Sequence, residues 1–308
     1  MQETRRRILE AISREAVSGP TLAARFDVSR AAVWKHVEAL REAGFRIESR
    51  REGYRLASVP EFGGEAVEFE LDAPFGVEYH ETIDSTNHRA RELAVDGATD
   101  TVVLADRQTG GRGRLDRQWS SPSGGIWMSL VCRPSFPPDR APIYTLAAAV
   151  AVTDSVRDRG IEAGIKWPND VLVGDDERKL AGILTEMEGE AGRISWIVVG
   201  IGINANVDGS AVPESATTIR ELVGDVDRRS LTQDVIERFE RFRNEPDSVL
   251  SAWRDRALTL GRRVRVEGAT EDVVGEAVDV EFPGRLVIVT EDGRRRVSAG
   301  DCEHLRPV

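Results

Sequence analysis

The chain has 308 residues, of which 40% are hydrophobic and 31% are charged. This composition supplies enough apolar side chains for more than one packed core and excludes a globally disordered chain. No run approaches the roughly 18 apolar residues of a membrane-spanning helix, and the first residues lack the apolar core of an export signal. The two cysteines, Cys132 and Cys302, and the four histidines match no metal or redox spacing. We therefore expect a cytoplasmic protein of two or three domains that holds no zinc or haem.

Charge is distributed unevenly along the chain. Forty-two Lys and Arg against 53 Asp and Glu give a net charge of −11, and the lysines number only three: Lys35, Lys166 and Lys179. Residues 1–58 carry 12 basic and 8 acidic side chains, a net of +4, which leaves 30 basic and 45 acidic, or −15, for the rest. A basic end on an acidic chain indicates an anionic partner for that end. The acidic, arginine-rich composition also favours a halophilic source, although a GC-rich genome would explain the arginines alone.

The basic end has the pattern of a winged helix-turn-helix. Apolar residues recur at helical spacing, Thr21 and Ser29 are positioned to cap helices, and Gly44 is placed to end one. The predicted elements are helices over about 3–16, 21–26 and 29–44 and a hairpin with strands at 45–50 and 54–56. Residues 58–64, with one proline and two glycines, are typical of a linker.

In a winged helix-turn-helix the third helix enters the major groove of double-stranded DNA and the wing meets phosphates. The alternative is a small helical domain that binds another protein. Cationic side chains on the outer positions of an otherwise anionic chain favour DNA. The expected DNA contacts are Ser29, Arg30, Lys35, His36, Arg50 and Arg51.

The remainder of the chain predicts a mixed α and β domain followed by short strands. Apolar or alternating segments predict strands near 77–81, 101–105, 126–131, 171–173, 180–186 and 194–201, and helices near 87–95, 143–159, 232–244 and 248–258. After Gly261, strands at 264–267, 273–280, 286–290 and 295–298 predict a small SH3-like β-barrel. The expected fold class is α+β, with domains at 1–58, 65–258 and 261–308.

A glycine- and arginine-rich loop, Gln108–Arg114, follows one of the predicted strands. Its glycines allow the backbone to approach a ligand closely, and its arginines offer forked donors to a carboxylate or phosphate. It does not end in the Gly-Lys-Ser/Thr of a Walker loop. A flexible surface loop rich in arginine is the alternative, and the loop alone does not decide between the two.

Two of the three lysines lie close together in Lys166–Asp170 and the following Lys179. Because arginine is used almost everywhere else, lysine at these positions indicates that they need a compact ammonium charge, which arginine does not supply. Asn169 and Asp170 supply oxygens suited to a magnesium–nucleotide complex. The alternative is a strand–turn–strand segment with ordinary solvated charges.

A third segment, Gly200–Asn204, ends an apolar strand. It lacks the last glycine and the following helix of a dinucleotide-binding fingerprint. Glycines at alternate positions instead flatten one face of a strand, on which a planar ligand could lie, or allow a helix to pack closely. Because these segments combine cationic and backbone groups and no nucleophile motif is found, they favour a reaction that joins two anionic reactants. Attack of a carboxylate on the α-phosphate of ATP is such a reaction.

The motifs together resemble the biotin–protein ligases. The resemblance rests on Ser85–Thr86–Asn87, the Gly-Arg-Gly-Arg loop with Trp119 after it, Lys-Trp-Pro-Asn-Asp, Arg-Lys-Leu-Ala-Gly-Ile-Leu and Gly-Ile-Asn, in this order. With a winged helix-turn-helix in front and a small barrel behind, the chain resembles the bifunctional kind, which is both ligase and biotin operon repressor. Lipoate ligases share the superfamily fold, and a ligand-sensing regulator without catalysis is the alternative from another class.

The resemblance implies a set of site residues. Catalysis would involve Lys179, Arg112 and Arg114. Biotin would contact Ser85, Thr86, Asn87, Gln108, Arg112, Gly113, Arg114, Lys179 and Gly202. ATP would contact Trp119, Lys166, Asn169, Asp170, Asn204 and Arg306, with Asn169 and Asp170 at the magnesium ion.

The resemblance also implies partners and a reaction in two steps. Biotinyl-5′-AMP forms first, and a lysine of a biotin carboxyl carrier protein then takes the biotin. The adenylate-bound form is expected to dimerise on operator DNA. Two features depart from the family pattern or match it only loosely: residues 297–300 lack an aromatic that some relatives place near the adenine, and 207–215 resembles the family's flexible loop only in position and polarity.

Overall fold

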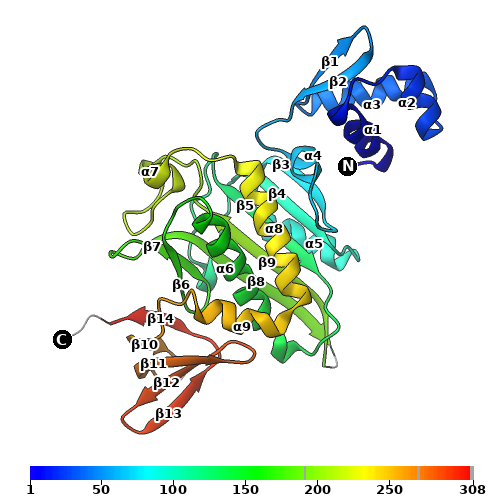
Figure 1. Ribbon diagram of the computed structural model, residues 1–308. Coiled ribbons are helices and arrows are strands. Elements are labelled where there is room, and N and C mark those ends of the chain that lie inside the picture. Colours follow the sequence, from blue (N-terminus) through cyan, green and yellow to red (C-terminus); the bar gives the residue numbers. More distant parts are fainter. Residues whose placement is uncertain (191, 269–270, 306–308) are drawn as a thin grey trace.

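The computed structural model describes residues 1–190, 192–268 and 271–305. The N-terminal unit is the predicted winged helix-turn-helix, with hydrophobic residues such as Ile8, Val33 and Leu40 fully buried between its helices (Figure 1). One detail of the prediction is wrong: Ser18, not Thr21, caps the second helix, because the Ser18 hydroxyl accepts the Thr21 N–H at 3.2 Å. The elements are α1 (Glu3–Arg14), α2 (Gly19–Phe26), α3 (Arg30–Glu42), β1 (Arg46–Arg50) and β2 (Gly53–Ser58).

The segment expected to be a linker continues into a short helix, α4 (Gly64–Glu68), which the sequence did not indicate. Phe69, just after it, is buried in the hydrophobic cluster of the N-terminal unit and meets Phe45 edge to face, with ring centres 6.3 Å apart. The Gln233 amide donates to the carbonyls of Val67 at 2.9 Å and Phe69 at 2.8 Å. This segment is therefore packed against both neighbouring parts of the protein.

The described residues of the central part form a seven-stranded sheet in the order β3-β4-β5-β9-β8-β7-β6. The pair β3 and β4 is parallel and the other neighbours are antiparallel. Strand β6 and helix α7 were not predicted; both are short and so carry little periodic signal. The strands are β3 (Gly76–Ile83), β4 (Thr101–Gln108), β5 (Ile126–Cys132), β6 (Ala163–Lys166), β7 (Asp170–Val173), β8 (Arg178–Glu190) and β9 (Arg193–Ile203), and the helices are α5 (Thr86–Val95), α6 (Pro142–Arg157), α7 (Ile219–Val223), α8 (Arg228–Asn244) and α9 (Pro246–Arg254).

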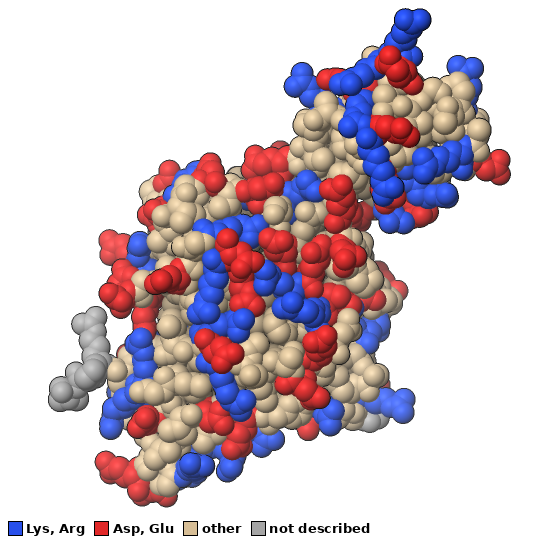
Figure 2. Space-filling model, viewed as in Figure 1, with Lys and Arg blue, Asp and Glu red and all other residues tan. Residues whose placement is uncertain are grey.

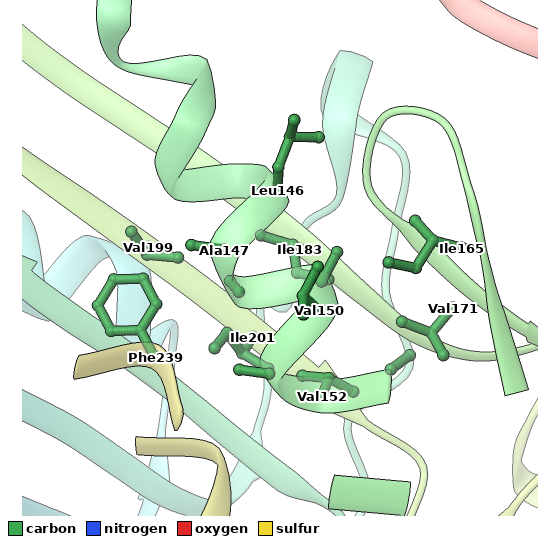
Figure 3. Packing of buried hydrophobic residues seen from close by; sticks show 14 of the residues in the cluster. Leu146, Ala147, Val150, Val152, Ile165, Val171, Ile183, Val199, Ile201 and Phe239 are labelled. Atoms are coloured by element: carbon green, nitrogen blue, oxygen red, sulfur yellow. The ribbon is translucent and has the colours of Figure 1, made fainter. Parts of the chain in front are cut away.

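Helix α6 lies between one face of this sheet and the helices α8 and α9 (Figures 1 and 3). Nearly all of its residues are buried, which agrees with its run of alanine and valine and its lack of a polar face. Leu146 and Val150 of α6 belong to the same core as Ile183 and Ile201 of the sheet and Phe239 of α8 (Figure 3). This core fixes one face of β8 and β9.

Helix α5 covers part of the opposite face, where Ala90 and Ala94 pack against Val198. Side chains alternate between the two faces along β9, so Ile201 points into the α6 core while Gly200 and Gly202 face the α5 side. At the start of α5, around Ser85–Asn87, this face opens into a cavity. The candidate site lies there.

The C-terminal unit is a five-stranded antiparallel sheet in its described residues, in the order β13-β12-β11-β10-β14 (Figure 1). The last strand, β14, was not predicted, and the closed SH3-like barrel stays a prediction. No helix in the described ranges is both long and apolar enough to cross a membrane. The strands are β10 (Arg263–Glu267), β11 (Val273–Glu281), β12 (Arg285–Thr290), β13 (Gly293–Val297) and β14 (Asp301–His304).

Candidate active site

A cavity of about 610 Å³ opens on the α5 face of the sheet. It is bounded by the start of α5, the arginine-rich loop after β4 and the segment 212–216. Most of the residues that the sequence assigned to biotin or ATP line it: Ser85, Thr86, Asn87, Gln108, Arg112, Gly113, Arg114, Trp119, Asn169, Asp170, Lys179, Gly202 and Asn204.

Two of the assigned residues are not part of this list. Lys166 ends β6 and is not among the residues that line the cavity, so its role at the nucleotide stays a prediction. Arg306 lies outside the residues that the structure describes.

Glycines form the floor of the cavity on neighbouring strands. A Cβ at Gly200 would lie 2.0 Å from Asn87 Oδ1, and a Cβ at Gly202 would lie 2.9 Å from Trp119 Nε1. Gly182 is paired with Gly202 across β8 and β9 and lies against the Lys179 side chain. The expected glycine-flattened face is present, and the Trp119 indole and the Asn87 amide lie directly on it.

One end of the cavity is lined by a network of hydroxyl and amide groups. Gln108 Oε1 accepts the N–H of Thr86 at 2.8 Å and its hydroxyl at 3.0 Å, which ties β4 to the first turn of α5. The Ser129 hydroxyl lies 2.8 Å from Thr86 Oγ1 and 2.6 Å from Asn87 Oδ1. The Asn87 amide donates to Glu186 at 2.8 Å. The side chains are thereby fixed in orientation, as recognition of a polar planar group requires.

Lys179 is one of the residues that line the cavity. Its ammonium lies 2.8 Å from Asp170 Oδ1 and 4.9 Å from the ring centre of Trp119. The carboxylate and the indole face both attract a cation and so hold the ammonium in place over the floor. Trp119 Nε1 is buried and makes no hydrogen bond within the described residues. The sequence assigned Trp119 to the nucleotide, and here it lies against the lysine.

The arginine-rich loop reaches from the cavity to the C-terminal unit. Arg114 donates to Asn169 Oδ1 at 3.0 Å and to the Gly300 carbonyl at 2.7 Å. Arg117 pairs with Asp301 at 2.6 Å. Arg112 is exposed at the cavity edge. The C-terminal unit therefore forms part of the wall of this site.

The magnesium assignment rests on Asn169 and Asp170. Asn169 Oδ1 accepts from Arg114 and its amide donates to the Ile183 carbonyl at 2.8 Å, so its side chain is already engaged. Asp170 retains a carboxylate beside Lys179, which fits a magnesium ion that takes its other ligands from phosphates and water. Among the described residues no group of three or more His, Cys, Asp or Glu could hold a metal by itself.

Several residues of the site were not found from the sequence. Ser129 lies in an ordinary apolar strand, and Gly182 stands in the Arg-Lys-Leu-Ala-Gly-Ile-Leu motif but was given no role; strand pairing brings them beside Gly200 and Gly202. Asn204 was assigned, but its environment was not foreseen: its amide donates to the Thr217 carbonyl at 3.1 Å, while its Oδ1 is buried and unpaired among the groups that the structure describes. The Gly-Ile-Asn motif was the available signal for it.

The N-terminal unit has a separate basic surface (Figure 2). Ser29 caps α3, and Arg30, Lys35 and the wing residue Arg51 are exposed. His36 is half-buried, and Arg50 pairs with Glu48 at 2.7 Å. The sequence analysis did not include Trp34, which is exposed to 54% between Arg30 and Lys35 on the outer face of α3. All of these positions stay predictions for DNA contact.

Three family models match successive parts of the chain. An HTH domain matches residues 4–55, the biotin/lipoate A/B protein ligase family matches residues 79–204, and the biotin protein ligase C terminal domain matches residues 259–305. The fold and the cavity thus define the class of biotin and lipoate protein ligases, here preceded by a helix-turn-helix.

Individual relatives narrow this class. The bifunctional ligase/repressor BirA of Bacillus subtilis is 37% identical over 312 residues, which cover 94% of this chain and 94% of that protein. The biotin–[acetyl-CoA-carboxylase] ligase of Mycobacterium tuberculosis is 36% identical over 236 residues, or 72% of this chain and 86% of that protein. A structure of the biotin protein ligase from Aquifex aeolicus in complex with biotin and ATP matches with a TM-score of 0.63 at 29% identity, covering 75% of this chain and 99% of that one. The chain belongs to the bifunctional ligase/repressor family of biotin protein ligases, as its motifs predict.

Proposed function

We propose that this protein is an ATP-dependent biotin–protein ligase that also binds DNA as a repressor. The observation that carries the proposal is the position of Lys179. Its ammonium lies between the hydroxyl and amide network around Asn87 and the nucleotide segment at Asp170, over a floor of glycine. A cation at this point would face both the carboxylate of bound biotin and the α-phosphate of bound ATP.

The first step joins the two anionic substrates. Ser85, Thr86, Asn87 and Gln108 bind the ureido ring with donors and acceptors of fixed orientation. A biotin carboxylate oxygen attacks the α-phosphorus, the bond to the β-phosphate oxygen breaks, and pyrophosphate leaves. Lys179, with Arg112 and Arg114, neutralises the charge that develops on the phosphoryl oxygens. The product is biotinyl-5′-AMP.

The second step uses a nucleophile from the partner. The amine of a carrier-protein lysine attacks the carbonyl carbon of the mixed anhydride, AMP leaves, and the amine gives up a proton as the amide forms. Both nucleophiles thus come from substrates. This accounts for a site built from cations, amides and glycine.

The nucleotide part of the proposal assigns ATP to Trp119, Asn169, Asp170 and Asn204. The unpaired Trp119 Nε1 and Asn204 Oδ1 are buried polar atoms in the cavity wall, and a ligand with a matching acceptor and donor would satisfy them. Magnesium would be held at Asp170 and would neutralise phosphate charge.

The same proposal covers the wider organisation of the chain. The domains would span 1–58, 65–258 and 261–308, with the last as an SH3-like barrel. The adenylate-bound protein would dimerise and bind operator DNA through Ser29, Arg30, Lys35, His36 and the wing arginines. A halophilic source is also proposed, on the basis of the charge balance alone.

A matched pair of lysine variants tests the ligase and repressor parts separately. Purified protein is incubated with labelled biotin, ATP, magnesium and a carrier domain, and label on the carrier is measured. Lys179→Ala should lose transfer and, because it forms no adenylate, should bind DNA from its own promoter region only as the ligand-free wild-type protein does, whereas Lys35→Ala should transfer normally and lose affinity for that DNA. Wild-type protein that forms no biotinyl-AMP would refute the ligase, and unchanged DNA affinity in a Lys35→Ala, Arg30→Ala double variant would refute the assigned DNA surface.

A further inference from the structure

A buried chain of hydrogen bonds lies outside the cavity, where the C-terminal unit meets the central sheet. His304 of β14 is at its centre, with a side chain only 5% exposed. Its Nδ1 lies 2.9 Å from Glu177 Oε2, in the turn between β7 and β8, and its Nε2 lies 2.9 Å from the hydroxyl of Thr259. Neither the sequence motifs nor the proposed reaction uses these residues.

This series of hydrogen bonds ends at Trp167, next to the proposed nucleotide-binding residues Asn169 and Asp170. Thr259 is fully buried, and its Oγ1 accepts the backbone N–H of Trp167 at 2.9 Å. The indole N–H of Trp167 donates to the Gly284 carbonyl, also at 2.9 Å. Trp167 is therefore held at its backbone and at its ring by groups that follow the central sheet in sequence.

The positions of the hydrogens assign a donor and an acceptor to each hydrogen bond in this series. A carboxylate only accepts, so the His304 nitrogen that faces Glu177 carries a hydrogen. Burial lowers the pKa of His304, with Lys166 and Arg262 acting in the same direction and Glu177 opposing it. The neutral imidazole then accepts at Nε2. The Thr259 hydroxyl must donate to it and is left to accept from Trp167, so each group has one defined role.

Trp167 stands two residues before Asn169, the first residue of this segment that lines the cavity. Asn169 accepts from Arg114 at 3.0 Å, and Asp170 pairs with Lys179 at 2.8 Å. A shift of the backbone at Trp167 would move both contacts, since two to three residues of this buried segment span only a few ångströms. The hydrogen-bond chain thus sets the position of groups that the proposed reaction needs.

We propose that His304 is a positioning residue for the nucleotide half of the reaction. Through Thr259 it holds Trp167 in place, and Trp167 sets Asn169 and Asp170 for ATP. This rests on the proposed ligase function. It gives the C-terminal unit a task that is separate from any direct contact with the nucleotide.

The substitution Thr259→Val tests the proposal because valine keeps the shape of threonine and lacks the hydroxyl. The KM for ATP should rise roughly five- to tenfold, as expected when a buried N–H loses its acceptor, while the KM for biotin stays within twofold. Thr259→Ser should restore the wild-type values. Thr232→Val is the matched control, because that equally buried hydroxyl donates to the Arg228 carbonyl within α8 at 2.7 Å; it should leave both KM values unchanged.

A second variant, His304→Phe, removes both ring nitrogens and keeps a ring in the pocket. It should raise the KM for ATP to the same degree, and the double variant with Thr259→Val should be no worse than either single one, because both break one chain. Additive effects would overturn the proposal. So would an unchanged KM for ATP in Thr259→Val, or equal rises for ATP and biotin.

Hydrogen exchange provides a readout that does not depend on catalysis. Amides of residues 165–167, 169 and 170 should exchange faster in Thr259→Val than in wild-type protein, and those of α8 should not. If the protein makes no biotinyl-AMP but the exchange difference is present, the proposed function fails and the hydrogen-bond chain stands. Unchanged exchange at these amides would refute the proposed hydrogen-bond link from Thr259 to Trp167.

Discussion

The ammonium of Lys179 lies 4.9 Å from the ring centre of Trp119 and 2.8 Å from Asp170, so it is held between an aromatic face and a carboxylate. Gly182 leaves little room beside this ammonium, because a Cβ there would lie 3.3 Å from Lys179 Nζ, and we expect the larger planar head of arginine to disturb these contacts. This geometry explains why a chain so rich in arginine has a lysine at this position.

Replacement of this lysine should remove the adenylation step. Lys179→Ala should raise the activation free energy of biotinyl-AMP formation by about 2–4 kcal/mol and so slow this step. This is the range typical of one lost charge-stabilising group. Pyrophosphate exchange with labelled pyrophosphate measures this step without a carrier protein. Lys179→Arg should also be impaired, because the fork cannot replace the point charge; full activity in either variant would remove Lys179 from the mechanism.

A second prediction concerns the glycines that form the floor of the cavity. Gly200→Ala would place a Cβ 2.0 Å from Asn87 Oδ1, so the Asn87 side chain must move away from Ser129. We expect a weaker affinity for biotin and a loss of stability of about 1–3 kcal/mol, as for other overpacked sites. Titration calorimetry and urea unfolding measure the two effects. Gly76→Ala, whose Cβ would meet nothing nearer than 3.7 Å, is the control and should change neither.

The DNA surface can be tested through its salt dependence. If Lys35 contacts a phosphate, Lys35→Ala should weaken binding to all sequences and lower the slope of log affinity against log salt by about one. Trp34, the exposed neighbour of Lys35, carries no charge. Trp34→Ala should therefore leave the salt slope unchanged, even if it changes the affinity for DNA. Fluorescence anisotropy of labelled promoter DNA from 0.1 to 1 M KCl provides both values. A wild-type slope in Lys35→Ala would place that lysine away from phosphates.

His304 also predicts a pH dependence of stability. Its pKa is lowered in the folded protein from an ordinary value of 6.5. The unfolded chain therefore takes up a proton below about pH 6.5 that the folded protein does not. The free energy of unfolding should consequently fall as the pH drops from 6.5 toward the folded pKa.

The variant His304→Phe isolates this component. Urea unfolding at pH 7.5 and 5.5 should show a smaller difference in His304→Phe than in the wild type. His36, whose pKa is also lowered by burial and by Arg5, contributes equally to both proteins and cancels in the comparison. A difference as large in the variant as in the wild type would contradict the assignment.

Much of the fold could be predicted because its elements carry strong local signals. The buried helix α6 was evident from a long apolar run after Pro142, and β9 from its branched residues. Strand β6 and helix α7 are four and five residues long, and so short a segment shows no clear period. The cap of α2 was misplaced by three residues because Ser18 and Thr21 both have a capping hydroxyl.

The site was predictable where a motif is continuous in sequence and not where strands bring residues together. Asn87, Lys179 and Gly202 each stand in a motif and line the cavity as expected. Ser129 contributes through its register opposite Gly200, which no local pattern encodes. The contact of Trp119 with Lys179 joins residues 60 positions apart, with β5, α6, β6 and β7 between them, so no local pattern encodes it, and the role of Trp119 at the nucleotide stays a prediction.

The burial of Phe69 against Phe45 has a consequence for how the molecule can be divided. The hydrophobic core of the winged helix-turn-helix is completed by a side chain eleven residues past the end of β2. A fragment that ends at residue 58 would leave Phe45 exposed to water. A chimera that joins this winged helix-turn-helix to another enzyme would therefore have to include residues 59–69. The N-terminal unit with a complete core therefore extends past its last strand to Phe69.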